Sequence, residues 1–126
     1  MTVRELYERI DGSYESALRI LRTEKLVSRF IVKFPDDASF ARMAEAWERR
    51  DPQGAFEGAH ALKGVCANLG LNCLSAAASD LAEEFRPGRR RELDDEEVTL
   101  RVAALRADYE RTKESIRAFA AEQQAQ

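Results

Sequence analysis

Hydrophobic residues recur along this chain at intervals of three and four positions, which is the spacing of one face of an α-helix. No segment of the sequence alternates apolar and polar residues over a length bounded by turn residues, as a half-buried β-strand would. The pattern therefore predicts an all-α protein.

The N-terminal part predicts three short helices. Thr2 and Glu5 have the spacing of a capping box, and Asp11-Gly12 is expected to end the first helix. Ser13 and Thr23 are the expected N-caps of the next two pieces, which could also fuse. Their apolar stripes comprise Val3, Leu6, Tyr7 and Ile10, then Tyr14, Ala17, Leu18 and Leu21, then Leu26, Val27, Phe30, Ile31 and Phe34.

The stripe changes direction around Phe34-Pro35, where a kink or break is expected because Phe40 and Trp47 point about half a turn away at about 100° per residue. A new helix begins at Pro52, since Asp51 can cap it and the missing N–H of proline costs nothing at the first helical position. This helix is expected to run to about Leu69.

Two further helices complete the pattern. Gly70 supplies a left-handed stop, and Asn72 is expected to cap a helix that Pro87-Gly88 ends. A charged connector then leads to an acidic group at 94–97, which favours the start of a long last helix because anions stabilise the positive end of a helix. The stripes of these two helices are Leu74, Ala77, Ala78, Leu81 and Phe85, then Val98, Val102, Leu105, Tyr109, Ile116 and Phe119.

These segments predict one domain, an antiparallel four-helix bundle over about residues 23–122, with short extra N-terminal helices over about residues 2–22 covering one end. Residues 123–126 carry no apolar stripe and are expected to fray. A length of 126 residues fits a single domain, and a bundle of this size can bury its core as a monomer.

Composition excludes several classes of function. The chain is 44% hydrophobic and 34% charged, as a folded globular domain is. Its net charge of -3 argues against a nucleic-acid partner. No window has the roughly 18 to 20 apolar residues of a membrane span, and the N-terminus has no signal-peptide pattern, so a cytoplasmic location is expected.

Rare residues limit the chemistry further. The chain has one histidine and two cysteines, with no CxxC or HExxH spacing, so no metal site is expected. Cys66 and Cys73 both have apolar neighbours in the sequence, which predicts two reduced thiols in the core.

The single histidine, His60, lies in the helix expected over residues 52–69. At about 100° per residue, six apolar residues of that helix fall between roughly 140° and 260° from His60. Polar and small residues fall within roughly 80° of it. The imidazole is therefore expected to face solvent. The core arc comprises Ala55, Ala59, Leu62, Val65, Cys66 and Leu69, and the solvent arc comprises Glu57, Lys63, Gly64, Ala67 and Asn68.

The surroundings of His60 favour a chemical role over that of an ordinary surface histidine. Gly58 and Gly64 each cost about 0.8–1 kcal/mol in a helix, so some other factor must favour a bare backbone. Gly64, with Ala67 and Asn68, would leave a flat patch for a partner, and Phe56 would add an apolar anchor. Lys63 can reach an anion on the ring. Transient phosphorylation of His60 fits this arrangement, because phosphoryl transfer depends chiefly on positioning and charge neutralisation.

The segment AHALKGVCANLG, with His60, Lys63, Gly64 and Gly70, resembles the signature of histidine-containing phosphotransfer (HPt) domains of multistep phosphorelays. The resemblance implies a four-helix bundle with a full-length match, and hence a stand-alone HPt protein. It implies that His60 accepts the phosphoryl group, that Lys63 holds its oxygens, that Gly64 makes room for the partner and that Gly70 is the glycine near the helix end. Arg86 lies where some members place a basic residue.

The same resemblance implies which proteins are the partners and that this chain needs no cofactor of its own. The partners would be a receiver domain, a hybrid sensor kinase or both, with Mg²⁺ supplied by the receiver and no cofactor in this chain. The sequence has no glycine-rich nucleotide loop, so it is not expected to be an enzyme that phosphorylates itself from ATP. The alternatives are a docking module whose histidine carries no phosphate and, third, an enzyme acting on a small molecule.

Overall fold

The computed structural model describes residues 1–125, and every regular element among them is helical, which confirms the all-α class and the helical bundle. The elements are α1 (Val3–Arg9), α2 (Tyr14–Leu21), α3 (Glu24–Ile31), the 3₁₀ helix η1 (Phe34–Asp36), α4 (Ser39–Glu48), α5 (Pro52–Asn68), α6 (Asn72–Phe85) and α7 (Asp95–Gln124).

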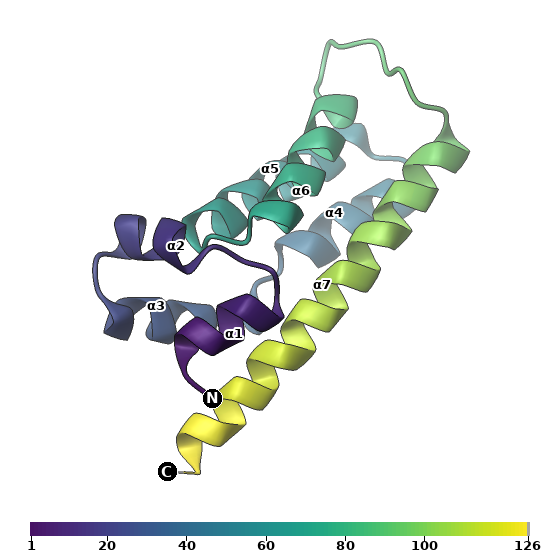
Figure 1. Ribbon diagram of the computed structural model, residues 1–126. Helices are drawn as coiled ribbons and strands as arrows, with labels where there is room; N and C mark the ends of the chain where they lie inside the picture. Colours follow the sequence, from purple (N-terminus) through teal and green to yellow (C-terminus); the bar gives the residue numbers. More distant parts are fainter. Residues whose placement is uncertain (126) are drawn as a thin grey trace.

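Helices α4, α5, α6 and α7 form the bundle, and α1, α2 and α3 gather at one end of it (Figure 1). Helix α5 packs against both α4 and α6. Residues 24–31, which the apolar pattern places in the bundle, form α3, and this helix packs with α2 and α1 instead. Of the segment expected to fray, Gln123 and Gln124 belong to α7, and residue 126 lies outside the described residues.

Most helix starts follow the sequence signals. Their N-cap side chains accept a hydrogen bond from a backbone N–H of the first turn, namely at Thr2, Ser13, Thr23, Asp51 and Asp94. One local expectation is wrong. Leu71 occupies the N-cap of α6, so Asn72 is already helical and caps nothing. Helix α1 ends directly before Asp11-Gly12, as expected, and Asp11 has a left-handed backbone with φ 57°.

The core contains most of the predicted apolar residues of α4 to α7, and Val65 and Ala77 are half-buried at its edge. The clearest exception to the prediction lies among the N-terminal helices. Phe30 of α3 is 42% exposed, although it belongs to the predicted stripe. Val27 and Ile31 of the same helix are fully buried. The main contacts of helix α3 are with α2 and α1, and they leave the ring of Phe30 open to solvent.

The close packing of α4 explains why position 58 of α5 is a glycine. A Cβ atom at this position would lie 2.5 Å from the backbone nitrogen of Met43 in α4. Only glycine permits so close an approach of two helix backbones. The helix-propensity cost of Gly58, for which the sequence offered no specific reason, is therefore explained by the packing of α4 on α5.

The N-terminal helices hold the turn at the end of α5. Gly70 has the predicted left-handed conformation, with φ 70°. Its carbonyl accepts a hydrogen bond of 2.8 Å from the Ser13 N–H. The hydroxyl of Tyr7 donates to the carbonyl of Leu69 over 2.7 Å, and burial raises the pKa of Tyr7 above its usual value. The direction of α5 is thus fixed at the end that follows His60.

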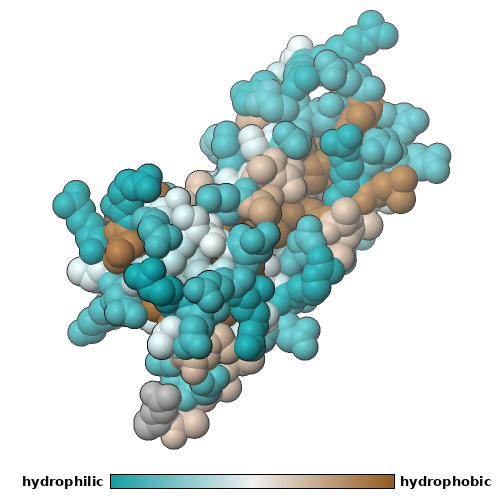
Figure 2. All heavy atoms as spheres, viewed as in Figure 1, coloured by the Kyte–Doolittle hydropathy of each residue, from teal (hydrophilic) through white to brown (hydrophobic). Residues whose placement is uncertain are grey.

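Hydrophilic residues dominate the surface in the view of Figure 2, with hydrophobic residues in small patches. Among the described helices, none is both long and apolar enough to cross a membrane.

Candidate functional site

Helix α5 presents two faces, as the angular arithmetic predicted. Ala55, Ala59, Leu62 and Cys66 are completely buried. The opposite face carries an exposed group that comprises His60, Lys63, Gly64, Ala67 and Asn68. Of the predicted core arc, Val65 is half-buried, because it lies at the border between the two faces. The helix backbone therefore holds the imidazole in solvent without help from a loop.

His60 stacks on the side chain one turn before it. The rings of Phe56 and His60 have centroids 5.7 Å apart and an angle of 23° between their planes. Phe56 is half-buried, and the guanidinium carbon of Arg86 lies over its ring, 5.2 Å from the centroid. The structure thus places Phe56 and Arg86, both singled out from the sequence, in one chain of contacts that ends at the imidazole.

Arg86 is engaged by a carboxylate of α6. It donates to both oxygens of Glu83, over 2.7 Å and 3.3 Å. This pair lowers the pKa of Glu83 below its usual value, and the charges of Arg89 and Lys63 lower it further. Since Glu83 balances much of its charge, Arg86 has less electrostatic attraction left for an additional anion.

Lys63 contrasts with Arg86 in its charge environment. Its side chain is exposed, and among residues 1–125 no carboxylate lies within ion-pair distance of its ammonium group. Its backbone carbonyl accepts a hydrogen bond of 3.1 Å from the hydroxyl of Ser75 in α6, which fixes this turn of α5. Lys63 acts on Glu83 through its charge but forms no ion pair with it, so an ammonium group not held by a carboxylate lies one turn from the imidazole.

Gly64 leaves the surface next to Lys63 bare. A Cβ atom built at Gly64 would meet nothing within 4 Å, in contrast to Gly58. The unfavourable helix propensity of this glycine has no internal packing reason. Together with Ala67, it gives α5 a low profile beside His60.

An apolar groove of about 510 Å³ adjoins this face. Val65 and Asn68 of α5 line one side of it, and Leu21 and Phe30 of the N-terminal helices line the other. Sequence reasoning missed this groove, because it placed Phe30 in the core. Asn68 belongs to both the exposed face of α5 and the groove, so the two surfaces are continuous.

Residues 25–115 match the family model described as the Hpt domain, and this range contains His60 together with the whole exposed face of α5. The chain belongs to the Hpt family. Hpt domains are phosphotransfer modules of two-component signalling, they interact with receiver or kinase domains, and they are not kinases themselves. No curated protein and no solved structure matches the chain.

The two cysteines differ from each other in this Hpt domain. Both are free thiols, but only Cys66 lies in the core, where burial raises its pKa to about 12. Cys73 is exposed, so the prediction of a core thiol is wrong for it. It follows Asn72 at the very start of α6, and its Sγ lies 4.0 Å from a carboxylate oxygen of Asp11.

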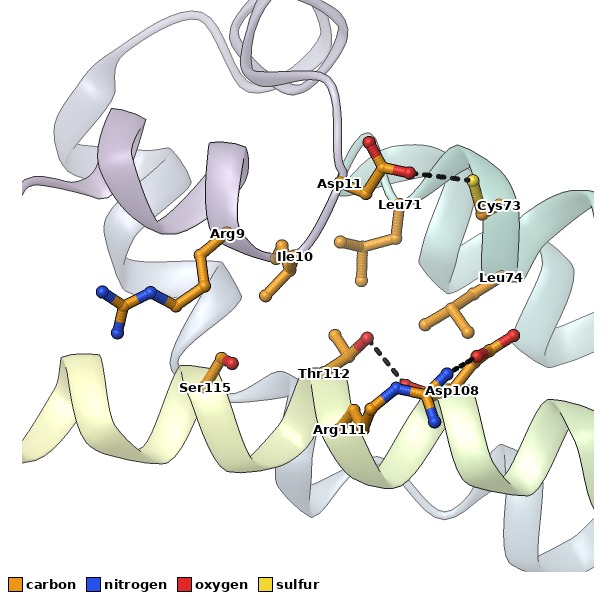
Figure 3. Close-up of a pocket in the computed structure, with 10 residues that line it drawn as sticks. All are labelled: Arg9, Ile10, Asp11, Leu71, Cys73, Leu74, Asp108, Arg111, Thr112 and Ser115. Carbon is orange, nitrogen blue, oxygen red and sulfur yellow. Dashed lines mark hydrogen bonds and ion pairs between the residues drawn. The ribbon is translucent and has the colours of Figure 1, made fainter.

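A separate cavity of about 380 Å³ lies between α1, the start of α6 and the middle of α7 (Figure 3). Its polar lining includes Arg9, Asp11, Asp108 and Arg111, and the last two form an ion pair with each other. None of the site residues predicted from the sequence lines it. Within residues 1–125, no group of three or more metal-binding side chains comes together.

Proposed function

We propose that this Hpt domain carries a phosphoryl group on His60 and relays it between the aspartates of receiver domains, or takes it from a sensor kinase. The observation that supports this most is the composition of the exposed face of α5. An accessible imidazole, an unpaired ammonium group and a bare glycine lie within two turns of one helix. These groups supply a nucleophile, a charge for the phosphoryl oxygens and room for a partner.

The transfer step needs little from this chain beyond those groups. A ring nitrogen of His60 attacks the phosphorus of the partner's aspartyl phosphate. The N–P bond forms as the P–O bond breaks, and the aspartate leaves as a carboxylate. Lys63 offsets negative charge on the equatorial oxygens. The Mg²⁺ of this step belongs to the receiver, and the reverse step returns the phosphoryl group to a carboxylate.

The receiver domain is proposed to dock on the exposed face of α5 and the adjoining groove. Gly64 and Ala67 would allow its loops to approach the imidazole. Asn68 and Phe30 would extend the contact into the groove, which is continuous with that face. The apolar lining of the groove and the small residues of α5 both favour close contact with a partner surface.

The purified protein should take no phosphate from ATP, and should take it from a phosphorylated receiver in the presence of Mg²⁺. The label is measured by radioactive or phosphate-affinity gel analysis, and should be acid-labile, as a phosphohistidine is. Receivers and hybrid kinases encoded beside this chain are the partners to test first. If receivers bind without any transfer, a docking module replaces this proposal.

Gly64→Gln is expected to block transfer without loss of stability. The side chain would fill the open space beside His60, while the helix gains roughly 0.5–1 kcal/mol from the removal of glycine. Transfer rates and thermal unfolding measure the two effects. Gly64→Ala is the matched control, with similar stability and near-normal transfer. Wild-type transfer by Gly64→Gln would show that the partner does not approach here.

Lys63→Ala is expected to slow transfer about tenfold, because one charge-assisted contact to the phosphoryl oxygens is lost while the nucleophile remains. The lifetime of the phosphorylated form should shorten as well. Rapid-quench kinetics with a phosphorylated receiver give the rate. Lys25→Ala removes an exposed lysine of α3 and serves as the control. An equal effect of both variants would point to general charge rather than to a contact at the phosphoryl group.

A further inference from the structure

Phe56 makes contacts that an exposed docking residue would not need. Its ring stacks on His60, and its side chain is half-buried, although the helix face around it is exposed. Arg86 lies over the same ring and is itself held by two hydrogen bonds to Glu83. Apart from His60, this phenylalanine is therefore held by packing against the core and by Arg86 at the C-cap of α6.

The direction of side chains on a helix makes this contact effective. Side chains lean toward the helix N-terminus, so the ring of His60 leans over the residue four positions earlier, which is Phe56. An imidazole in solvent would otherwise exchange among several rotamers. Stacking against the fixed ring of Phe56 selects the His60 rotamers in which the two ring planes are close to parallel. In this structure the angle between the planes is 23°.

The contact leaves the reactive atoms free. A phosphoryl group on a ring nitrogen lies in the plane of the imidazole, whereas a stacked neighbour covers a face of that ring. Lys63 lies one turn beyond His60, on the side away from Phe56. The imidazole is thus placed between an apolar ring and a cation, with its edge open to a partner.

We infer that Phe56 is a positioning residue for His60, holding the imidazole in the rotamer that attacks phosphorus, and that Arg86 and Glu83 hold Phe56. The effect of Phe56 on the transfer rate rests on the proposed function of His60, whereas its effect on the orientation of the imidazole does not. This role differs from that of an apolar anchor for the partner, which the sequence suggested for Phe56.

The test compares Phe56→Leu with Phe56→Tyr. Phe30→Leu removes an exposed ring elsewhere and is the control for the NMR readout only, because Phe30 lines the proposed docking groove. The first readout is the NMR shift of the His60 Hδ2 and Hε1 protons in the protein without phosphate. Phe56→Leu should remove the upfield ring-current shift, and the other two variants should retain it. Circular dichroism checks that each variant is folded.

The second readout is transfer from a phosphorylated receiver over a range of its concentrations. Phe56→Leu should lower the rate at saturation about three- to tenfold, the cost of leaving one side chain free to rotate. The receiver concentration that gives half the maximal rate should stay within about twofold, and Phe56→Tyr should restore the saturated rate.

Two outcomes would overturn the inference. One is an unchanged His60 spectrum in Phe56→Leu, which would show that the stack does not exist in solution. The other is a normal saturated rate with weaker receiver binding, which would make Phe56 a partner anchor. If wild-type protein accepts no phosphate at all, the proposed function fails, and the NMR comparison alone decides whether Phe56 orients the imidazole.

Discussion

Replacing His60 by glutamine is expected to abolish phosphate incorporation and to leave the bundle folded. Glutamine offers polar atoms of similar reach but no nucleophilic ring nitrogen, so no N–P bond can form. The imidazole makes no core contact, since His60 faces solvent while Ala59 and Leu62 beside it are buried. The free energy of unfolding, measured by thermal denaturation, should therefore change by no more than about 0.5 kcal/mol, as for an ordinary surface substitution.

The measurement is a transfer assay with the phosphorylated receiver, run on wild type and variant at equal concentration. Binding of the unphosphorylated receiver, by calorimetry, is the control, because His60→Gln should still dock. A label that persists in His60→Gln, or one that survives acid, would show that another residue carries the phosphoryl group. A variant that fails to fold would contradict the placement of His60 on the solvent face.

Gly70→Ala is expected to cause the largest loss of stability, about 2–4 kcal/mol. Two costs add at this position. The left-handed backbone, with φ 70°, disfavours any residue with a Cβ, and that Cβ would lie 2.2 Å from the carbonyl oxygen of Ser13. Relief of the clash would require the α1–α2 linker to move away from the α5–α6 turn and strain the Ser13 N–H bond to Gly70.

Urea unfolding of Gly88→Ala separates the two costs. Gly88 has a similar φ of 81°, but a Cβ there would meet nothing within 4 Å. Its replacement should cost about 1 kcal/mol from the backbone alone. If Gly70→Ala were no worse than Gly88→Ala, the close contact with Ser13 would not exist in solution.

Local sequence signals were sufficient for most of the helices and for the buried and exposed faces of α5. A helix has a fixed angle per residue, so positions relative to His60 follow from counting alone, and the buried and exposed residues of α5 confirm the count. Cap residues and proline fixed most helix starts in the same way, because their effects act within one turn.

Features that depend on contacts between residues far apart in the sequence could not be predicted from the spacing of residues along the chain. Gly58 meets Met43 of another helix, and Phe30 stays exposed because of where α3 packs. Cys73 has apolar neighbours in the sequence, but the start of α6 turns it outward. The contact of Arg86 with Phe56 joins two helices through side chains 30 positions apart, and no periodicity within one helix reports it.

The open position of His60 has a kinetic consequence. The imidazole lies on the exposed face of α5, and the opposite face of that helix packs in the core. Because His60 is exposed in the described part of the chain, a partner can reach it without local unfolding. The proposed exchange of the phosphoryl group would then need no lid to open first, and its rate would depend only on docking of the two proteins and on the transfer step itself. Mild denaturant, which loosens gated sites first, should leave its rate almost unchanged until the whole bundle unfolds.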